Sequence, residues 1–112
     1  MGSSRVTELA CVPAAIPSPE RQGHFALARE LFQVQARERV ALANGYAILF
    51  QSDAFPDVAR FVANERKCCP FMTFELTLAP ASGPLWLRMT GPDGTREALD
   101  AELNLGGRCG CK

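Results

Sequence analysis

Two adjacent cysteines, Cys68 and Cys69, stand directly before Pro70. Proline disfavours the helical conformation of the residue before it, so the sequence predicts that both thiols lie at the exit of a helix. Two thiolates presented by one turn are soft ligands, of the kind that suits Hg(II), Cu(I), Zn(II) and As(III). One of the two could instead be a small buried apolar residue, since free cysteine is among the most buried residue types. For an adjacent pair beside proline, we favour metal binding.

A second thiol pair, Cys109 and Cys111, flanks Gly110 near the C-terminus. Glycine allows both sulfurs to turn toward one ion. The sequence predicts that residues 106–112 form a flexible Cys-x-Cys tail that delivers or captures an ion, although a tail without that function would look the same. The fifth cysteine, Cys11, stands alone in an apolar stretch and by itself is more typical of a core residue than of a ligand. The paired Cys-x-x-Cys spacing of structural zinc sites is absent from the sequence.

Two further titratable side chains could take part in thiol chemistry. Glu65 lies one turn before Cys69, where it could orient a thiol or accept its proton. It could equally be a partly exposed helix carboxylate, and both alternatives stay open. His24, the only histidine, falls in a polar helix start and is expected to be solvated.

The composition limits the partners and the location that we expect. Lysine plus arginine and aspartate plus glutamate are equal at 12 each, which leaves no electrostatic footprint for nucleic acid or an anionic membrane. No apolar run approaches the roughly 20 residues that span a bilayer, and the polar N-terminus has no signal-peptide segment, so we expect a cytoplasmic protein. In that reducing compartment, five cysteines indicate metal or redox chemistry rather than a disulfide framework.

The hydrophobic periodicity predicts the elements that would position these residues. Three helices are expected: about 18–36, capped by Ser18, then 55–68, and then 93–103. Asn44-Gly45 lies between alternating apolar residues, which predicts a hairpin turn with positive φ at both positions. A half-buried strand at 72–78 and a partner strand at 85–89 form a second hairpin. The sequence therefore predicts a single α+β domain over residues 1–105, with an antiparallel sheet of about four strands from two hairpins, packed with three helices.

The segment Glu65-Arg66-Lys67-Cys68-Cys69-Pro70-Phe71 resembles the signature Glu-Arg-x-Cys-Cys-Pro-Phe of a family of small, largely uncharacterised bacterial proteins associated with heavy-metal resistance. Other matching segments are Gly83-Pro84-Leu85-Trp86-Leu87, Thr90-Gly91-Pro92-Asp93-Gly94 and Asn44-Gly45-Tyr46-Ala47, together with Cys11 before the helix start at Pro19 to Arg21. The resemblance covers roughly residues 9 to 103, and its specific part is the Cys-Cys-Pro-Phe block.

This resemblance implies metal handling and raises Cys11 to a candidate third ligand. Three thiolates would suit As(III) or Hg(II), and an open fourth position would suit zinc. Two metal–sulfur bonds of about 2.3 Å to one ion would then hold the sulfur of Cys11 within roughly 5 Å of Cys68 or Cys69. Cys109 and Cys111 lie outside the matched block.

The function that we favour from the sequence is binding of a soft heavy-metal ion, with mercury ahead of copper(I), zinc and arsenite. Its metal ligands would be Cys68, Cys69 and Cys11, with Cys109 and Cys111 as a mobile transfer arm. A metal-handling partner protein would suit such a role, and the chain would be a monomer or a homodimer. The first alternative is a thiol-dependent enzyme, either an organometal lyase with Glu65 as the acid or a thiol–disulfide oxidoreductase. The second is a small interaction domain whose cysteines are incidental.

Overall fold

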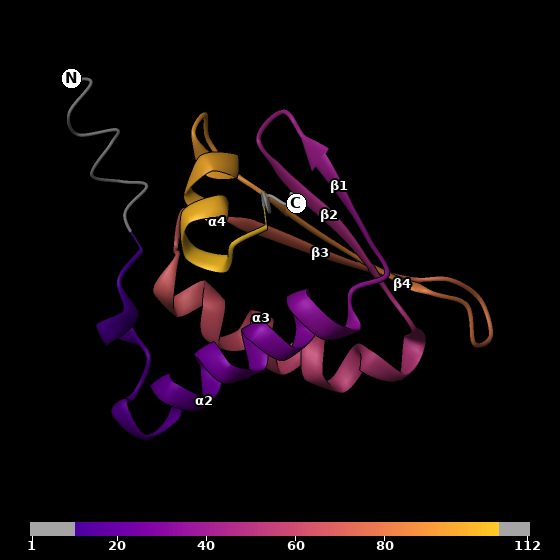
Figure 1. Cartoon of the computed structure of the whole chain (residues 1–112), viewed down its shortest axis with the longest axis horizontal. Helices are drawn as coiled ribbons and strands as arrows, with labels where there is room; N and C mark the ends of the chain where they lie inside the picture. Colours follow the sequence, from indigo (N-terminus) through magenta and orange to yellow (C-terminus); the bar gives the residue numbers. More distant parts are fainter. Residues whose placement is uncertain (1–10, 106–112) are drawn as a thin grey trace.

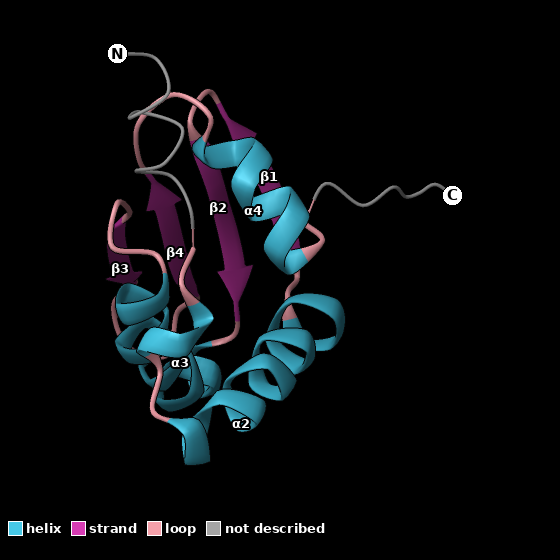
Figure 2. Cartoon of the chain, turned by 90° about the vertical axis from the view of Figure 1, so that its left-hand side faces the viewer, coloured by secondary structure: helices cyan, strands magenta, loops and turns pink. Residues whose placement is uncertain are grey.

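Three helices pack on one face of a four-stranded antiparallel sheet in the computed structural model, which describes residues 11–105 (Figures 1 and 2). The helices are α2 (Ser18–Arg29), α3 (Phe55–Cys68) and α4 (Thr95–Leu103). The strands are β1 (Glu38–Leu42), β2 (Gly45–Phe50), β3 (Thr73–Leu78) and β4 (Leu85–Thr90). Two hairpins meet through β2 and β4, so the sheet order is β1-β2-β4-β3. The predicted α+β class and the two hairpins are confirmed.

The first helix differs from the expected one in how it begins and ends. Ser18 is its first helical residue and makes no capping hydrogen bond, because Pro17 occupies the capping position. The α-helix ends at Arg29, and the π-helical segment η2 (Glu30–Gln35) continues it. Leu31 and Phe32 in that wider turn are buried, so the apolar face continues into the core as the spacing predicted.

The turn of the first hairpin lies one residue earlier than predicted. Leu42 pairs with Gly45, so the turn residues are Ala43 and Asn44, and neither has a positive φ. Gly45 is needed for a different reason, since a Cβ there would collide with the backbone carbonyl of Met89 on β4. The turn is also tied to the end of β4, because the Asn44 side chain donates a hydrogen bond of 2.8 Å to the Gly91 carbonyl.

The core lies between the helices and the two central strands. Alternate residues of β2 and β4 are buried, namely Tyr46, Ile48, Phe50, Leu85, Leu87 and Met89. The edge strand β3 is more exposed than the half-buried strand that the sequence predicted at 72–78. Leu76 and Leu78 of β3 are 37% and 47% exposed although they share the core face of the sheet. Alternation therefore identified the correct face of β3, but burial also requires a helix over that edge.

The close approach of β2 and β4 at Gly45 generates a stability prediction. Gly45→Ala should lower the free energy of unfolding by about 2 kcal/mol, because backbone must shift to accommodate the new Cβ. The matched control is Gly23→Ala in α2, where a Cβ meets no heavy atom within 4 Å. That change should raise stability by about 0.5–1 kcal/mol. Urea unfolding measures both, and equal effects would contradict the packing argument.

Candidate functional site

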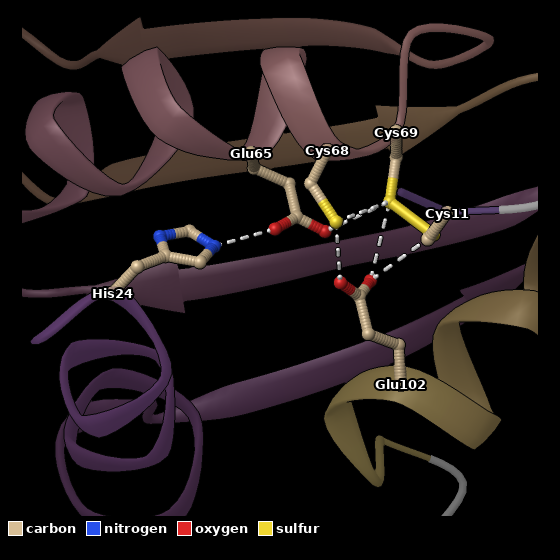
Figure 3. Close-up of a disulfide and its surroundings, with 6 residues drawn as sticks. All are labelled: Cys11, His24, Glu65, Cys68, Cys69 and Glu102. Atoms are coloured by element: carbon tan, nitrogen blue, oxygen red, sulfur yellow. Dashed lines mark hydrogen bonds and ion pairs between the residues drawn. A yellow bond between two sulfur atoms is a disulfide. The ribbon is translucent and has the colours of Figure 1, made fainter. Parts of the chain in front are cut away.

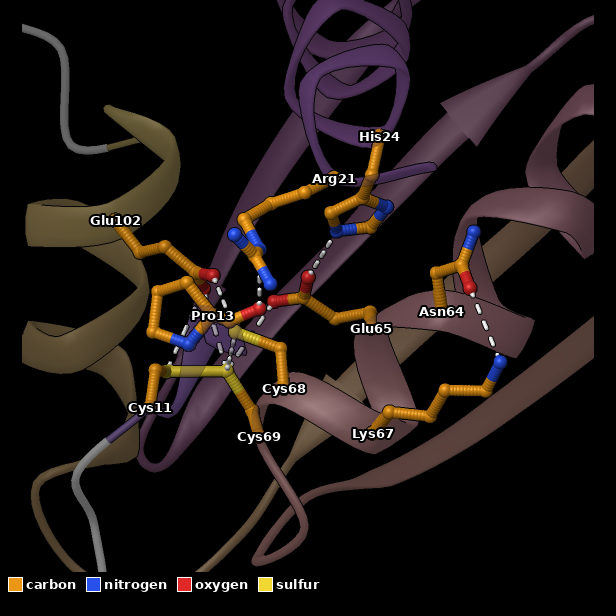
Figure 4. A network of polar contacts seen from close by, with 10 residues as sticks. All are labelled: Cys11, Pro13, Arg21, His24, Asn64, Glu65, Lys67, Cys68, Cys69 and Glu102. Carbon is orange, nitrogen blue, oxygen red and sulfur yellow. Dashed lines mark hydrogen bonds and ion pairs between the residues drawn. A yellow bond between two sulfur atoms is a disulfide. The ribbon is translucent and has the colours of Figure 1, made fainter. Parts of the chain in front are cut away.

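Residues 11–16 are held against α2 and α3 by hydrogen bonds, and these contacts fix the position of Cys11. The Val12 amide donates to the Cys68 carbonyl at 2.7 Å. Arg21 of α2 donates to the Pro13 carbonyl at 3.1 Å (Figure 4). It also donates to the Ile16 carbonyl at 3.1 Å. The Ile16 side chain is fully buried in a small apolar cluster with the two adjacent cysteines. Backbone and side-chain contacts thus hold this segment across the end of α3.

The end of α3 presents the adjacent cysteines as the sequence predicted. Cys68 is the last helical residue, and Cys69 leaves the helix with φ −122° before Pro70. The Cys69 amide still donates to the Glu65 carbonyl at 2.7 Å, which closes the last turn. Both side chains are fully buried because they continue the apolar face of this amphipathic helix.

Three cysteine sulfurs and one carboxyl oxygen form a compact cluster (Figure 3). One ligand atom from each of Cys11, Cys68, Cys69 and Glu102 lies within 4.8 Å of every other. Cys11 and Cys69 are joined by a disulfide with a Cα–Cα distance of 4.6 Å, and the Cys68 sulfur is 3.8 Å from that of Cys69. The predicted proximity of Cys11 to the pair is confirmed. The disulfide itself departs from the expectation that these cysteines would not be cross-linked.

Glu102 of α4 is the member of the cluster that the sequence analysis missed. The Cys68 thiol donates to it at 3.4 Å, and its other oxygen lies 3.6 Å from the Cys11 sulfur and 3.4 Å from the Cys69 sulfur. The sequence feature that could have identified Glu102 is its position three residues after Leu99 and next to Leu103, both of which are buried. An acid at that spacing falls beside the apolar face of its helix.

Burial raises the pKa values of the groups in this cluster. The pKa of Glu102 is raised to about 8, first by burial and then by the neighbouring Glu65 carboxyl. The pKa of the Cys68 thiol is raised to about 12, first by burial and then by the negative charge of Glu102 and Glu65. Without a metal, the raised pKa values therefore favour the protonated forms of Glu102 and Cys68.

His24 is buried, so the prediction that it is solvated was wrong. It is 2% exposed, its ring stacks on Phe61 at a centroid distance of 5.2 Å, and its Nε2 lies 2.8 Å from Glu65 Oε1. Its place four residues before Ala28 and seven before Leu31 puts it on the buried stripe of α2, a signal that the polar neighbours concealed. Burial lowers the pKa of His24 and raises that of Glu65.

Glu65 connects this histidine to the cysteine cluster. Its second oxygen, Oε2, lies 3.4 Å from the Cys69 sulfur, and the side chain is fully buried. Of the two alternatives left open by the sequence, the structure therefore supports a buried carboxyl oriented toward the Cys69 sulfur and not an exposed carboxylate. Figure 4 shows the resulting chain of polar contacts from His24 through Glu65 to the sulfurs.

The comparisons with protein-family models, with curated proteins and with solved structures found no match. Cys109 and Cys111, the predicted transfer arm, lie outside the described residues. Within residues 11–105, no helix combines the length and apolar character that crossing a bilayer requires.

The raised pKa of Glu102 generates a pH-dependent stability prediction for the metal-free protein. In the unfolded chain this carboxyl ionises near its ordinary value of 4.5, whereas in the folded protein it ionises near 8. Its contribution to stability is therefore complete below pH 4.5 and is lost as the pH rises toward 8. Glu102→Gln should raise the free energy of unfolding by about 2 kcal/mol at pH 8 and have little effect at pH 4. We expect less than the full pKa shift would give, because Glu65 is coupled to Glu102 and shares the cost of burial.

Chemical unfolding of the disulfide-bonded protein at pH 4, 6 and 8 measures this effect. The control is Glu97→Gln on the exposed side of the same helix, which should leave the pH profile unchanged. A Glu102→Gln profile parallel to that of the wild type would show that Glu102 is ionised in the folded protein at neutral pH.

Proposed function

We propose that the protein binds a soft heavy-metal ion as cargo, through Cys11, Cys68 and Cys69 with Glu102 as a fourth donor. The observation that carries the proposal is the convergence of these four donor atoms within 4.8 Å from three separate segments of the chain. Three sulfurs and one oxygen form a donor set that prefers soft or borderline ions. The ion would be sequestered or passed on.

The buried thiols favour an ion that binds sulfur tightly. Since the pKa of Cys68 is raised to about 12, the ion must displace the thiol proton in order to bind. Mercury is the first candidate, because Hg(II) is a soft ion that suits thiolate ligands. Arsenite is the second, because As(III) with three thiolates is neutral, whereas Hg(II) with three thiolates keeps one negative charge in a buried site. Copper(I) and zinc rank behind these two.

The wider setting of this function extends the proposal. The resemblance to proteins associated with heavy-metal resistance, a reducing cytoplasm and a metal-handling partner protein all suit such a role. The Cys109 and Cys111 pair would act as the transfer arm, joining the coordination sphere of the ion before another thiolate leaves it. A monomer or a homodimer could carry the site, because one chain supplies all four donors.

The test is a titration of the freshly reduced protein with Hg(II) and with arsenite, followed by native mass spectrometry. Replacing both Cys68 and Cys69 by serine should lower the affinity at least tenfold, which is about 1.4 kcal/mol. The matched control replaces Cys109 and Cys111 by serine and should retain one tightly bound ion. An affinity within tenfold of the wild type for the first variant would place the site elsewhere.

A second candidate function, cleavage of a metal–carbon bond, is favoured by one observation. The Glu102 carboxyl lies 3.4–3.6 Å from all three sulfurs. Glu65, the acid expected from the sequence, has one short contact with a sulfur, at 3.4 Å from that of Cys69. A carboxylic acid beside a thiolate-bound organometal could transfer its proton to the carbon, which would leave as a hydrocarbon while the thiolates keep the metal.

The two functions separate when the reduced protein is incubated with phenylmercury. Catalysis predicts more than one benzene released per protein in the presence of a thiol that removes Hg(II), with at least a tenfold loss in Glu102→Gln. Binding alone predicts a stoichiometric adduct and no benzene. The oxidoreductase alternative receives less support, since Cys68 is fully buried and its pKa of about 12 leaves little thiolate to attack a disulfide.

A further inference from the structure

The disulfide between Cys11 and Cys69 occupies two of the three sulfurs that the proposed ion requires. A sulfur in a disulfide carries no proton to displace and no thiolate charge, so it is a weak ligand. In this state, Cys68 and Glu102 are the remaining members of the cluster that can act as donors. The bound ion and the disulfide are therefore mutually exclusive uses of the same atoms.

We propose that the redox state of the Cys11–Cys69 pair controls the site, so that the disulfide excludes the metal and its reduction creates the binding site. This inference rests on the proposed function, because it assigns a regulation to the same donor atoms. The structure then represents the oxidised form, in which the disulfide prevents metal binding.

The reduced site is already assembled, because the contacts that hold Cys11 do not depend on the disulfide. The Val12 amide donates to the Cys68 carbonyl, and Arg21 donates to the carbonyls of Ile16 and, as Figure 4 shows, Pro13. When the sulfur–sulfur bond breaks, the backbone on both sides of it therefore stays in place. The freed thiols remain within reach of one ion without refolding.

The entry point for a reductant is Cys11. Cys69 is fully buried, whereas Cys11 is partly exposed at the edge of the cluster. A low-molecular-weight thiolate would attack the Cys11 sulfur, form a mixed disulfide there and release the Cys69 thiolate, which takes up a proton. A second low-molecular-weight thiol then attacks the mixed disulfide, leaves Cys11 as a thiol and departs as the small-molecule disulfide. Two electrons and two protons have then moved from the small thiols to the protein.

Oxidation reverses this net two-electron change and would expel the ion. Hydrogen peroxide would take two electrons from the Cys11 and Cys69 thiolates, forming the sulfur–sulfur bond and, with two protons, two water molecules. The oxidation number of the metal does not change. Left with Cys68 and Glu102, the ion loses two of its three sulfur ligands and is released to competing thiols. An oxidant would thus act as the unloading signal of the site.

The test compares the oxidised and reduced forms of the variant that lacks Cys109 and Cys111, so that the cluster alone is measured. Hg(II) is titrated in the absence of free thiol, against a competing chelator, with native mass spectrometry as the readout. We expect one ion per reduced protein and at least a hundredfold weaker binding to the oxidised protein. Peroxide added to the loaded, reduced protein should release the ion. Peptide mapping should find Cys11 linked to Cys69 and Cys68 free.

Two variants test the two parts of the proposal. Cys11→Ser should bind more weakly than the reduced parent but with the same affinity before and after peroxide, because the controlling pair is gone. Arg21→Gln should weaken binding to the reduced protein about tenfold, because Cys11 is no longer held in place, while the oxidised form behaves as the parent does.

Three outcomes would overturn the proposal. Equal affinity of the oxidised and reduced forms would remove the redox control and leave the proposed metal binding intact. A disulfide that contains Cys68 would assign the control to the wrong pair. Failure of both forms to bind Hg(II) or arsenite would remove the proposed function and its regulation together.

Discussion

The hydrogen bond between His24 and Glu65 joins α2 to α3 inside the protein, and the geometry of the cluster depends on it. Both side chains are almost completely buried, so each needs the other as a polar partner in an apolar setting. The bond aligns the two helices so that Arg21, one turn before His24, can hold the carbonyls of Pro13 and Ile16. It also directs the second oxygen of Glu65 toward the Cys69 sulfur. The buried pair of His24 and Glu65 thus positions α2, the segment 11–16 that α2 holds, and the sulfur of Cys69.

Most of the fold could be predicted from periodicity, because the helices and the central strands are amphipathic. What failed depends on contacts between elements. The turn at Ala43 and Asn44 lies one residue early, since Gly45 belongs to β2, where its lack of a side chain allows the close approach of β4. The exposure of Leu76 on β3 could not be read from alternation, because it reflects how far the helices extend over the sheet. Local patterns specify an element and its faces, while the coverage of those faces is a tertiary property.

The candidate site was predictable where its residues had an unusual local context. Pro70 indicated that the adjacent pair Cys68 and Cys69 lies at a helix end. Cys11 was linked to the pair by the resemblance to the family with the Cys-Cys-Pro-Phe block. Glu102 and His24 were missed, since each sits among polar neighbours and only its helical spacing places it on a buried stripe. The disulfide was not predictable either, because the oxidation state of a thiol depends on its surroundings as well as on its sequence.

The cluster draws its members from widely separated parts of the chain, with a sequence separation of 58 from Cys11 to Cys69 and of 91 from Cys11 to Glu102. A covalent link between Cys11 and Cys69 lowers the entropy of the unfolded chain, which stabilises the folded protein by about 4 kcal/mol. A bound ion would impose a similar restriction. The protein would then be more stable against unfolding when it is oxidised or holds an ion, and least stable when it is reduced and empty. Cellular proteases, which cut the transiently opened chain, would remove molecules in that state first. The same four side chains would in this way make the lifetime of the protein depend on both its oxidation state and its cargo.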